Sequence, residues 1–126
     1  MTGYELHELL AANRELVSDT WNFFLSVHVA ILGIIFIASG RVGFFQRLVL
    51  VAAYLGFMFT NYRAQTDNYS AQISIVEQIR SLTGPDAAIA QALINDQVMW
   101  ITDYLMYVFA GAATVSSLII LLIRRD

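Results

Sequence analysis

The chain alternates between long uncharged stretches and segments in which apolar and charged residues repeat with the period of a helix. Residues 21–39 and 104–123 contain no charged side chain, and residues 44–60 contain only Arg47, near the start of the run. Each run falls within the about 17–25 residues that a helix needs to cross a hydrocarbon layer. The sequence therefore predicts an integral membrane protein with three transmembrane spans.

The segment before the first span has the pattern of an amphipathic helix. Residues 2–5 read Thr-Gly-Tyr-Glu, a capping box that begins a helix, and no glycine or proline interrupts residues 4–32. Apolar residues fall on one face and acids on the far side. The apolar face consists of Leu6, Leu9, Leu10, Leu16 and Val17, and the acids are Glu5, Glu8, Glu15 and Asp19. We expect this helix to continue directly into the first span.

The other two spans are predicted to extend outward in the same way. Apolar positions repeat at helical spacing after the second span, at Tyr62, Tyr69, Ile73, Val76 and Ile79. We interpret the polar residues among positions 61–78 as a solvated helix face. The dipeptide Gly84-Pro85 is typical of a boundary between helices. The third helix is predicted to run from Pro85 into the third span without interruption.

Together these patterns predict an all-α fold in which three transmembrane helices extend outward as a three-helix bundle. One membrane domain would cover residues 1–126. Its predicted segments, in chain order, are an outer amphipathic helix (1–20), span 1 (21–39), a cytoplasmic turn (40–43), span 2 (44–60), an outer helical hairpin (61–103), span 3 (104–123) and a cytoplasmic tail (124–126).

The arginines predict how the chain is oriented. The turn, the start of the second span and the C-terminal end hold four arginines and one acid, whereas the opposite side holds three arginines and nine acids. Arginine-rich segments favour the cytoplasmic side of a membrane. We therefore expect the C-terminus in the cytoplasm and the N-terminus outside, in what we take to be a bacterial inner membrane.

Composition excludes several kinds of chemistry. The chain has no cysteine, and all seven of its basic residues are arginines, so thiol catalysis and lysine Schiff bases are excluded. No phosphate-binding glycine loop, nucleophile elbow or metal-ligand spacing occurs. The acidic balance argues against a nucleic-acid partner. We expect no catalytic residue and no metal site, and an enzyme is the less favoured class.

The most unusual residue is His28, which falls near the middle of the first span, where ionisable groups are costly. Depth matching places Tyr54 at a similar level. Three interpretations stay open: a neutral imidazole hydrogen-bonded to Tyr54 or to a backbone carbonyl, a proton-relay or pore-lining group in an oligomer, and a haem or metal ligand. The second histidine, His7, is expected on the surface of the N-terminal helix.

Two further groups of residues are candidates for function. Small and hydroxyl-bearing residues on the spans could serve packing or line a pore, and these are Ser26, Thr114, Ser116 and Ser117, together with His28 and Tyr54. Ser26 belongs to a small or polar strip with Asn22, Ala30 and Gly33. Asp19, Arg63 and Asp103 are expected to form a charge cluster just outside the outer interface, which could hold the helices in register or attract cations.

Three functions are consistent with these features. The first is a homo-oligomeric membrane assembly, with a channel or pore for cations or protons as its activity. The second is a non-catalytic accessory subunit of a larger respiratory, photosynthetic or transport complex. The third is a haem-binding electron carrier that uses His28. In each case the lipid bilayer is one partner, and further copies of the chain or other membrane subunits are the other.

Overall fold

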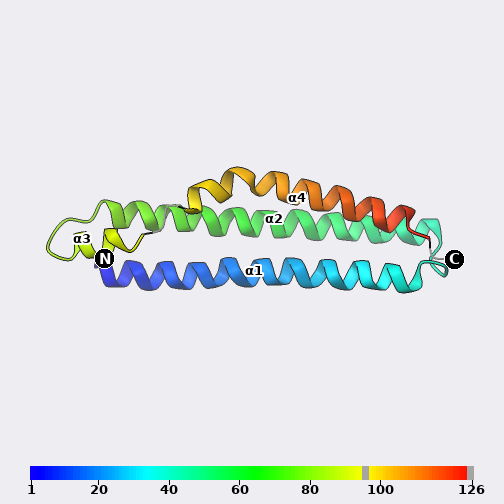
Figure 1. Cartoon of the computed structure of the whole chain (residues 1–126), viewed down its shortest axis with the longest axis horizontal. Helices are drawn as coiled ribbons and strands as arrows, with labels where there is room; N and C mark the ends of the chain where they lie inside the picture. The colour runs from blue at the N-terminus through cyan, green and yellow to red at the C-terminus, as the bar shows by residue number, and fades with distance from the viewer. Residues whose placement is uncertain (95–96, 125–126) are drawn as a thin grey trace.

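A computed structural model describes the backbone of residues 1–94 and 97–124 and the side chains of residues 1–94 and 103–124. Helix α1 (Gly3–Ala38) and helix α2 (Phe44–Arg80) are joined by a tight turn, and a short helix α3 (Ala87–Ala92) precedes helix α4 (Gln97–Leu122). Figure 1 shows α1 and α2 running antiparallel along their whole length. Helix α4 returns along the half of α2 nearest the turn, and α3 lies at the opposite end.

Three of these helices are long and apolar enough to cross a membrane: Gly3–Ala38, Phe44–Arg80 and Asp103–Leu122. The prediction of an all-α integral membrane protein with three transmembrane helices is confirmed. At 1.5 Å per residue, the 36 residues of α1 extend over about 55 Å, well beyond a hydrocarbon layer of about 30 Å. Both helices are therefore too long to lie wholly within the membrane. The N-terminal part of α1 and the C-terminal part of α2 continue outside it.

The helix ends follow the local signals in the sequence. The Thr2 side chain accepts from the Glu5 amide, and the Glu5 carboxylate accepts from the Thr2 amide, which completes the predicted capping box. Gly84 adopts a positive φ of 111°, a conformation that residues with a Cβ rarely adopt, and the chain reverses there after α2. The next helix begins at Ala87 rather than at Pro85.

The outer halves of α1 and α2 are packed together by a small apolar cluster. Leu6 and Leu10 of α1 are buried against Val76 and Ile79 of α2, with Ala90 of α3 closing the end. The predicted apolar face of α1 is therefore correct only in part. Leu9 and Leu16 stay outside the cluster and are 43% and 56% exposed.

The interpretation of the polar segment of α2 as a solvated face is correct only in part, because Asp67, Ser74 and Gln78 are exposed but other polar residues are not. One side of the helix, made of Asn61, Gln65, Tyr69 and Gln72, is buried against the rest of the chain. Hydrogen bonds between α2 and α1 satisfy some of the buried amide groups. Gln65 Nε2 donates to the Val17 carbonyl over 3.2 Å, and Asn13 Nδ2 of α1 donates to the Asn68 carbonyl over 2.9 Å. Buried amides are tolerated here because main-chain carbonyls of the neighbouring helix supply acceptors.

The predicted continuous third helix is also wrong, because it is divided into α3 and α4. Helix α3 is held at the outer end by polar contacts. Gln91 Nε2 lies within hydrogen-bonding distance of three carbonyl oxygens at the end of α2, and His7 Nε2 lies 2.9 Å from the Ala90 carbonyl oxygen. His7 is therefore half-buried and tied to α3, which corrects its expected surface position.

The role of Gln65 can be tested by replacing it. The side chain is fully buried, so Gln65→Ala removes a hydrogen bond between α1 and α2 and leaves a cavity. We expect the free energy of unfolding in detergent to fall by about 2 kcal/mol. The matched control is Gln78→Ala, an exposed glutamine on the same helix, which should leave stability unchanged. Equal losses in the two variants would contradict the buried polar contact.

Candidate functional site

His28 is fixed at membrane depth by hydrogen bonds on both ring nitrogens. Its Nδ1 lies 2.6 Å from the Phe24 carbonyl oxygen, one turn earlier on α1, and its Nε2 lies 2.6 Å from the Tyr54 hydroxyl on α2. The Tyr54 hydroxyl is also 3.3 Å from the Ala112 carbonyl oxygen of α4, with Ser116 as a further hydrogen-bonding neighbour. His28 thus makes both of the hydrogen bonds that were expected as alternatives, and the Tyr54 hydroxyl lies within 3.3 Å of acceptors on both α1 and α4.

The hydrogen bonds between His28 and Tyr54 are compatible with either a neutral or a protonated imidazole ring. A carbonyl oxygen can only accept, so Nδ1 carries a hydrogen and Nε2 of the neutral ring accepts the Tyr54 proton. Were the ring protonated, Nε2 would donate to Tyr54, and the Tyr54 hydroxyl would donate to Ala112 instead. Aromatic rings enclose the pair, since the imidazole packs against Phe24, Tyr54 and Phe57. Among the described residues, no further titratable group bonds to the pair.

The same contacts give no support to a haem ligand. A haem iron would need one ring nitrogen of His28, and both are already engaged. Within the described part of the chain, no cluster of three or more histidine, cysteine, aspartate or glutamate side chains could hold a metal ion. The contacts of His28 fit a packing role, and the proton-relay and haem interpretations stay predictions.

The hydroxyl-bearing candidates separate into two sets. Ser26 and Thr114 are exposed, and each donates to the carbonyl of the residue four positions earlier in its own helix, over 2.8 Å. Ser116 is buried beside Tyr54, and the buried Ser117 hydroxyl has no partner among the described residues. The structure thus brings His28, Tyr54 and Ser116 together, while Ser26 and Thr114 point outward.

The outer charged residues are placed on the surface. Asp19, Arg63 and Asp103 are all exposed, and no ion pair joins them in the region that the structure describes. Exposed pairs of this kind contribute about 0–1 kcal/mol when they do form. The geometry leaves these side chains free to act as a charged rim around the helices.

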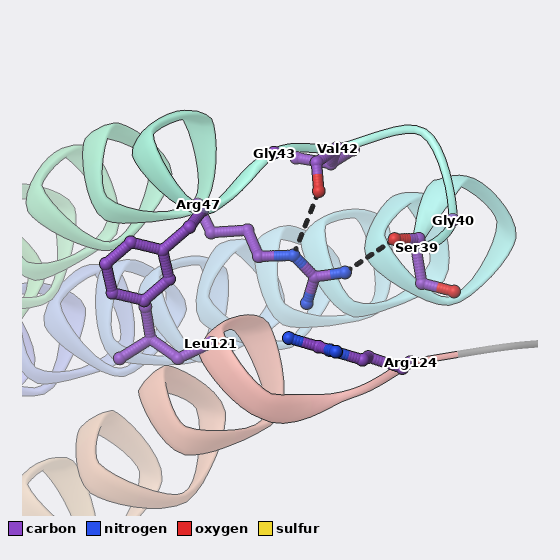
Figure 2. Close-up of a pocket in the computed structure, with 8 residues that line it drawn as sticks. Ser39, Gly40, Val42, Gly43, Arg47, Leu121 and Arg124 are labelled. Atoms are coloured by element: carbon purple, nitrogen blue, oxygen red, sulfur yellow. Dashed lines mark hydrogen bonds between the residues drawn. The ribbon is translucent and has the colours of Figure 1, made fainter.

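Arg47 is the functional residue that the sequence did not single out. Its side chain is only 5% exposed and reaches into the space where the ends of α1, α2 and α4 meet. It donates to four main-chain carbonyls: Nη2 to Ser39, Nη1 to Ile120 and Ile123, and Nε to Val42, over 2.6–3.3 Å. Figure 2 shows the bonds to Ser39 and Val42.

These contacts explain how the arginine is tolerated in a buried position. The last carbonyls of a helix have no partner within it, and each helix C-terminus carries about half a negative charge. Arg47 satisfies the ends of α1 and α4 together, so two half charges roughly balance one guanidinium. The signal in the sequence was a single charge at the start of a span, but its targets are backbone atoms, which a sequence pattern does not display.

Comparison with known protein families, curated proteins and solved structures finds no match to this chain. Function must therefore be argued from the arrangement of its own residues.

The contribution of Arg47 can be measured by replacing it with an uncharged residue. Arg47→Gln removes at least two of the four bonds and leaves helix carbonyls without donors. We expect the free energy of unfolding in detergent to fall by about 3 kcal/mol. Arg41→Gln is the control, because Arg41 is exposed in the adjacent turn and carries the same charge. An Arg47→Gln protein as stable as the control would refute the proposed capping role.

Proposed function

We propose that several copies of this chain assemble side by side in the membrane through the outward face of α1. The observation that carries the proposal is a line of exposed apolar residues on α1 that recurs every seven residues and continues beyond the span. Leu9, Leu16 and Phe23 form this line and are 43%, 56% and 58% exposed, although the Phe23 ring also makes an edge contact with Phe57 of α2. Lipid can cover Phe23, but Leu9 and Leu16 lie in the part of α1 expected to project into water.

The same face continues into the membrane with small residues. Ser26 and Ala30 are exposed, and a Cβ added at Gly33 would meet nothing within 4 Å. In lipid, small residues allow helix backbones to approach closely. Within one chain this strip packs against neither α2 nor α4, so it is available to a helix from another copy.

The geometry favours contact between like helices. All copies share one orientation in the membrane, so α1 would meet α1 of a second copy in parallel around an axis along the membrane normal. Apolar residues every seventh position then face their symmetry mates, as in a parallel coiled coil. Asp19 interrupts this line at the outer boundary, where water can solvate its carboxylate.

A conduction role, the activity that we favour for such an assembly, would use the space between copies. The interior between the spans of one chain is filled by Phe24, Ile35, Tyr54, Phe109 and Ile120. The acidic surface of the outer helices would concentrate cations at the mouth of a conduit. Ion flux into liposomes that contain the purified protein tests this role. If no flux occurred at any pH, the conduction role would be overturned, but the proposed assembly of copies would not.

A second candidate, an accessory subunit of a larger complex, is favoured by a different observation. Cβ atoms added at Gly56 of α2 and Gly111 of α4 would also meet nothing within 4 Å. These glycines lie on faces that an α1 contact would leave uncovered. Other membrane subunits could pack closely there.

Cysteine cross-linking tests the assembly directly, because the natural chain has no cysteine. We expect Ala12→Cys, which lies on the proposed face, to form a disulfide-linked dimer when native membranes are oxidised. Ala11→Cys is the matched control, since it is the neighbouring exposed alanine on a different side of α1. Disulfides need Cα atoms within about 7 Å, so the control should stay monomeric.

Two outcomes would count against the proposal. Equal cross-linking of Ala11→Cys and Ala12→Cys would show random collision. An absence of cross-links, together with recovery of other membrane proteins in a gentle detergent purification, would favour the accessory subunit instead.

The orientation also belongs to the proposal, with the turn and the C-terminus in the cytoplasm of a bacterial inner membrane. Arg41, Arg47 and Arg124 at one end of the bundle support it. An impermeant maleimide should label Ser70→Cys in intact spheroplasts and Gly40→Cys only after permeabilisation; both positions are exposed. The reverse pattern would overturn the orientation.

A further inference from the structure

A cavity at the turn end of the bundle has the composition of an anion site. Its volume is about 360 Å³, and its lining includes Ser39, Gly43, Phe44, Arg47 and Arg124. Small-molecule sites in proteins range from about 300 to 1,000 Å³. Figure 2 shows the side chains of Arg47 and Arg124 facing this space from α2 and from the end of α4.

Among the described residues, the charges around the cavity are mainly positive. The ends of α1 and α4 together offset the single charge of Arg47, as described above. Arg124 and Arg41 remain, and the N-terminus of α2 at Phe44 adds a further partial positive charge. No carboxylate occurs among the described residues between Thr20 and Thr60 or between Tyr104 and Arg124.

Arg47 also keeps a donor for a ligand. A guanidinium has five N–H groups, and the four carbonyl bonds use Nε, both hydrogens of Nη1 and one of Nη2. One Nη2 hydrogen therefore has no acceptor in the described part of the chain. The side chain is more than nine-tenths buried and lines the cavity, so this donor is fixed in position.

The surroundings indicate where the anion comes from. Phe44, which lines the cavity, is 68% exposed, and the residues next to its lining, Phe45 and Leu122, are 77% and 70% exposed. Apolar side chains at the end of a span lie in the hydrocarbon or at its boundary. A ligand that carries an anion on an apolar body would satisfy both the arginines and this rim.

We propose that this cavity binds a phosphate group, supplied by the head group of an anionic phospholipid. Arg47 would donate its remaining Nη2 hydrogen to a phosphate oxygen, and Arg124 would approach from the other side, while the acyl chains follow Phe44 and Leu122 into the bilayer. Arginine suits this role because its planar group matches phosphate oxygens. The proposal does not depend on the assembly of copies through α1.

Native mass spectrometry of the full chain released from nanodiscs tests the site. With phosphatidylglycerol and phosphatidylcholine present together, we expect the protein to retain phosphatidylglycerol preferentially. Arg124→Gln should lower that retention about fivefold, the effect of one arginine near an anionic surface. Arg63→Gln is the control, because it removes an exposed arginine from the same protein at the opposite side of the membrane. The preference should also weaken as salt is raised.

Further measurements determine whether the phosphate comes from a lipid or from solution, and whether Asp126 of the chain itself occupies the cavity. If inorganic phosphate at millimolar concentration displaced phosphatidylglycerol, the ligand would still be a phosphate group. The proposal that a lipid supplies it would then be overturned. Equal retention of the two lipids by the natural chain, or equal losses in Arg124→Gln and Arg63→Gln, would overturn the site. A preference that appears only in Asp126→Asn would assign the cavity to that carboxylate and would also overturn it.

Discussion

The fold depends on polar side chains of α2 that bind main-chain carbonyls of the helices beside it. Arg47 binds carbonyls at the ends of α1 and α4, Tyr54 donates at mid-membrane to His28, which in turn binds a carbonyl of α1, and Gln65 binds a carbonyl of α1 further out. Lipid chains are as apolar as leucine, so apolar contact alone gives membrane helices little reason to associate. Hydrogen bonds at three levels supply the missing specificity, each contributing about 0.5–1.5 kcal/mol or more where a charge takes part.

This dependence makes α2 the central element of the molecule. Both α1 and α4 pack mainly on α2 and touch each other little, so each keeps a broad outward face. In the most apolar part of α1, only 11% of the residues are buried within the chain. Two exposed surfaces are available for the proposed assembly. One is formed by the leucines of outer α1, and the other by the glycines that meet no neighbour. At the turn, Arg47 holds the ends of α1 and α4 together.

Much of the architecture could be predicted from the sequence, because spans are a property of composition and length. The uncharged runs predicted the three spans, and the capping box at Thr2 predicted where α1 begins. The pairing of His28 with Tyr54 could also be predicted, since depth in a membrane can be counted in residues from the interface. A buried imidazole needs a partner at its own level.

The rest could not be predicted, because it depends on which atoms a polar side chain meets. Gln65 and Asn13 are polar residues of the kind that usually lie on a solvated helix face. They can be buried here because carbonyls of the neighbouring helix accept their hydrogen bonds. Helix α3, which is separate from α4, is held by contacts that Gln91 makes with the end of α2 and that His7 of α1 makes with Ala90. Arg47 looked like a boundary charge, and its capping role depends on two helix ends that converge only in the folded chain.

The central claim is that α1 and α2 remain paired through polar contacts well beyond the bilayer. Hydrogen–deuterium exchange of the full chain in nanodiscs, resolved by peptide, measures this most directly. The account predicts slow exchange over residues 6–20 and 61–80, with protection comparable to that of the spans. Complete exchange of both segments within seconds, while residues 21–39 and 44–60 stay protected, would show that the helices separate at the membrane surface and would contradict it.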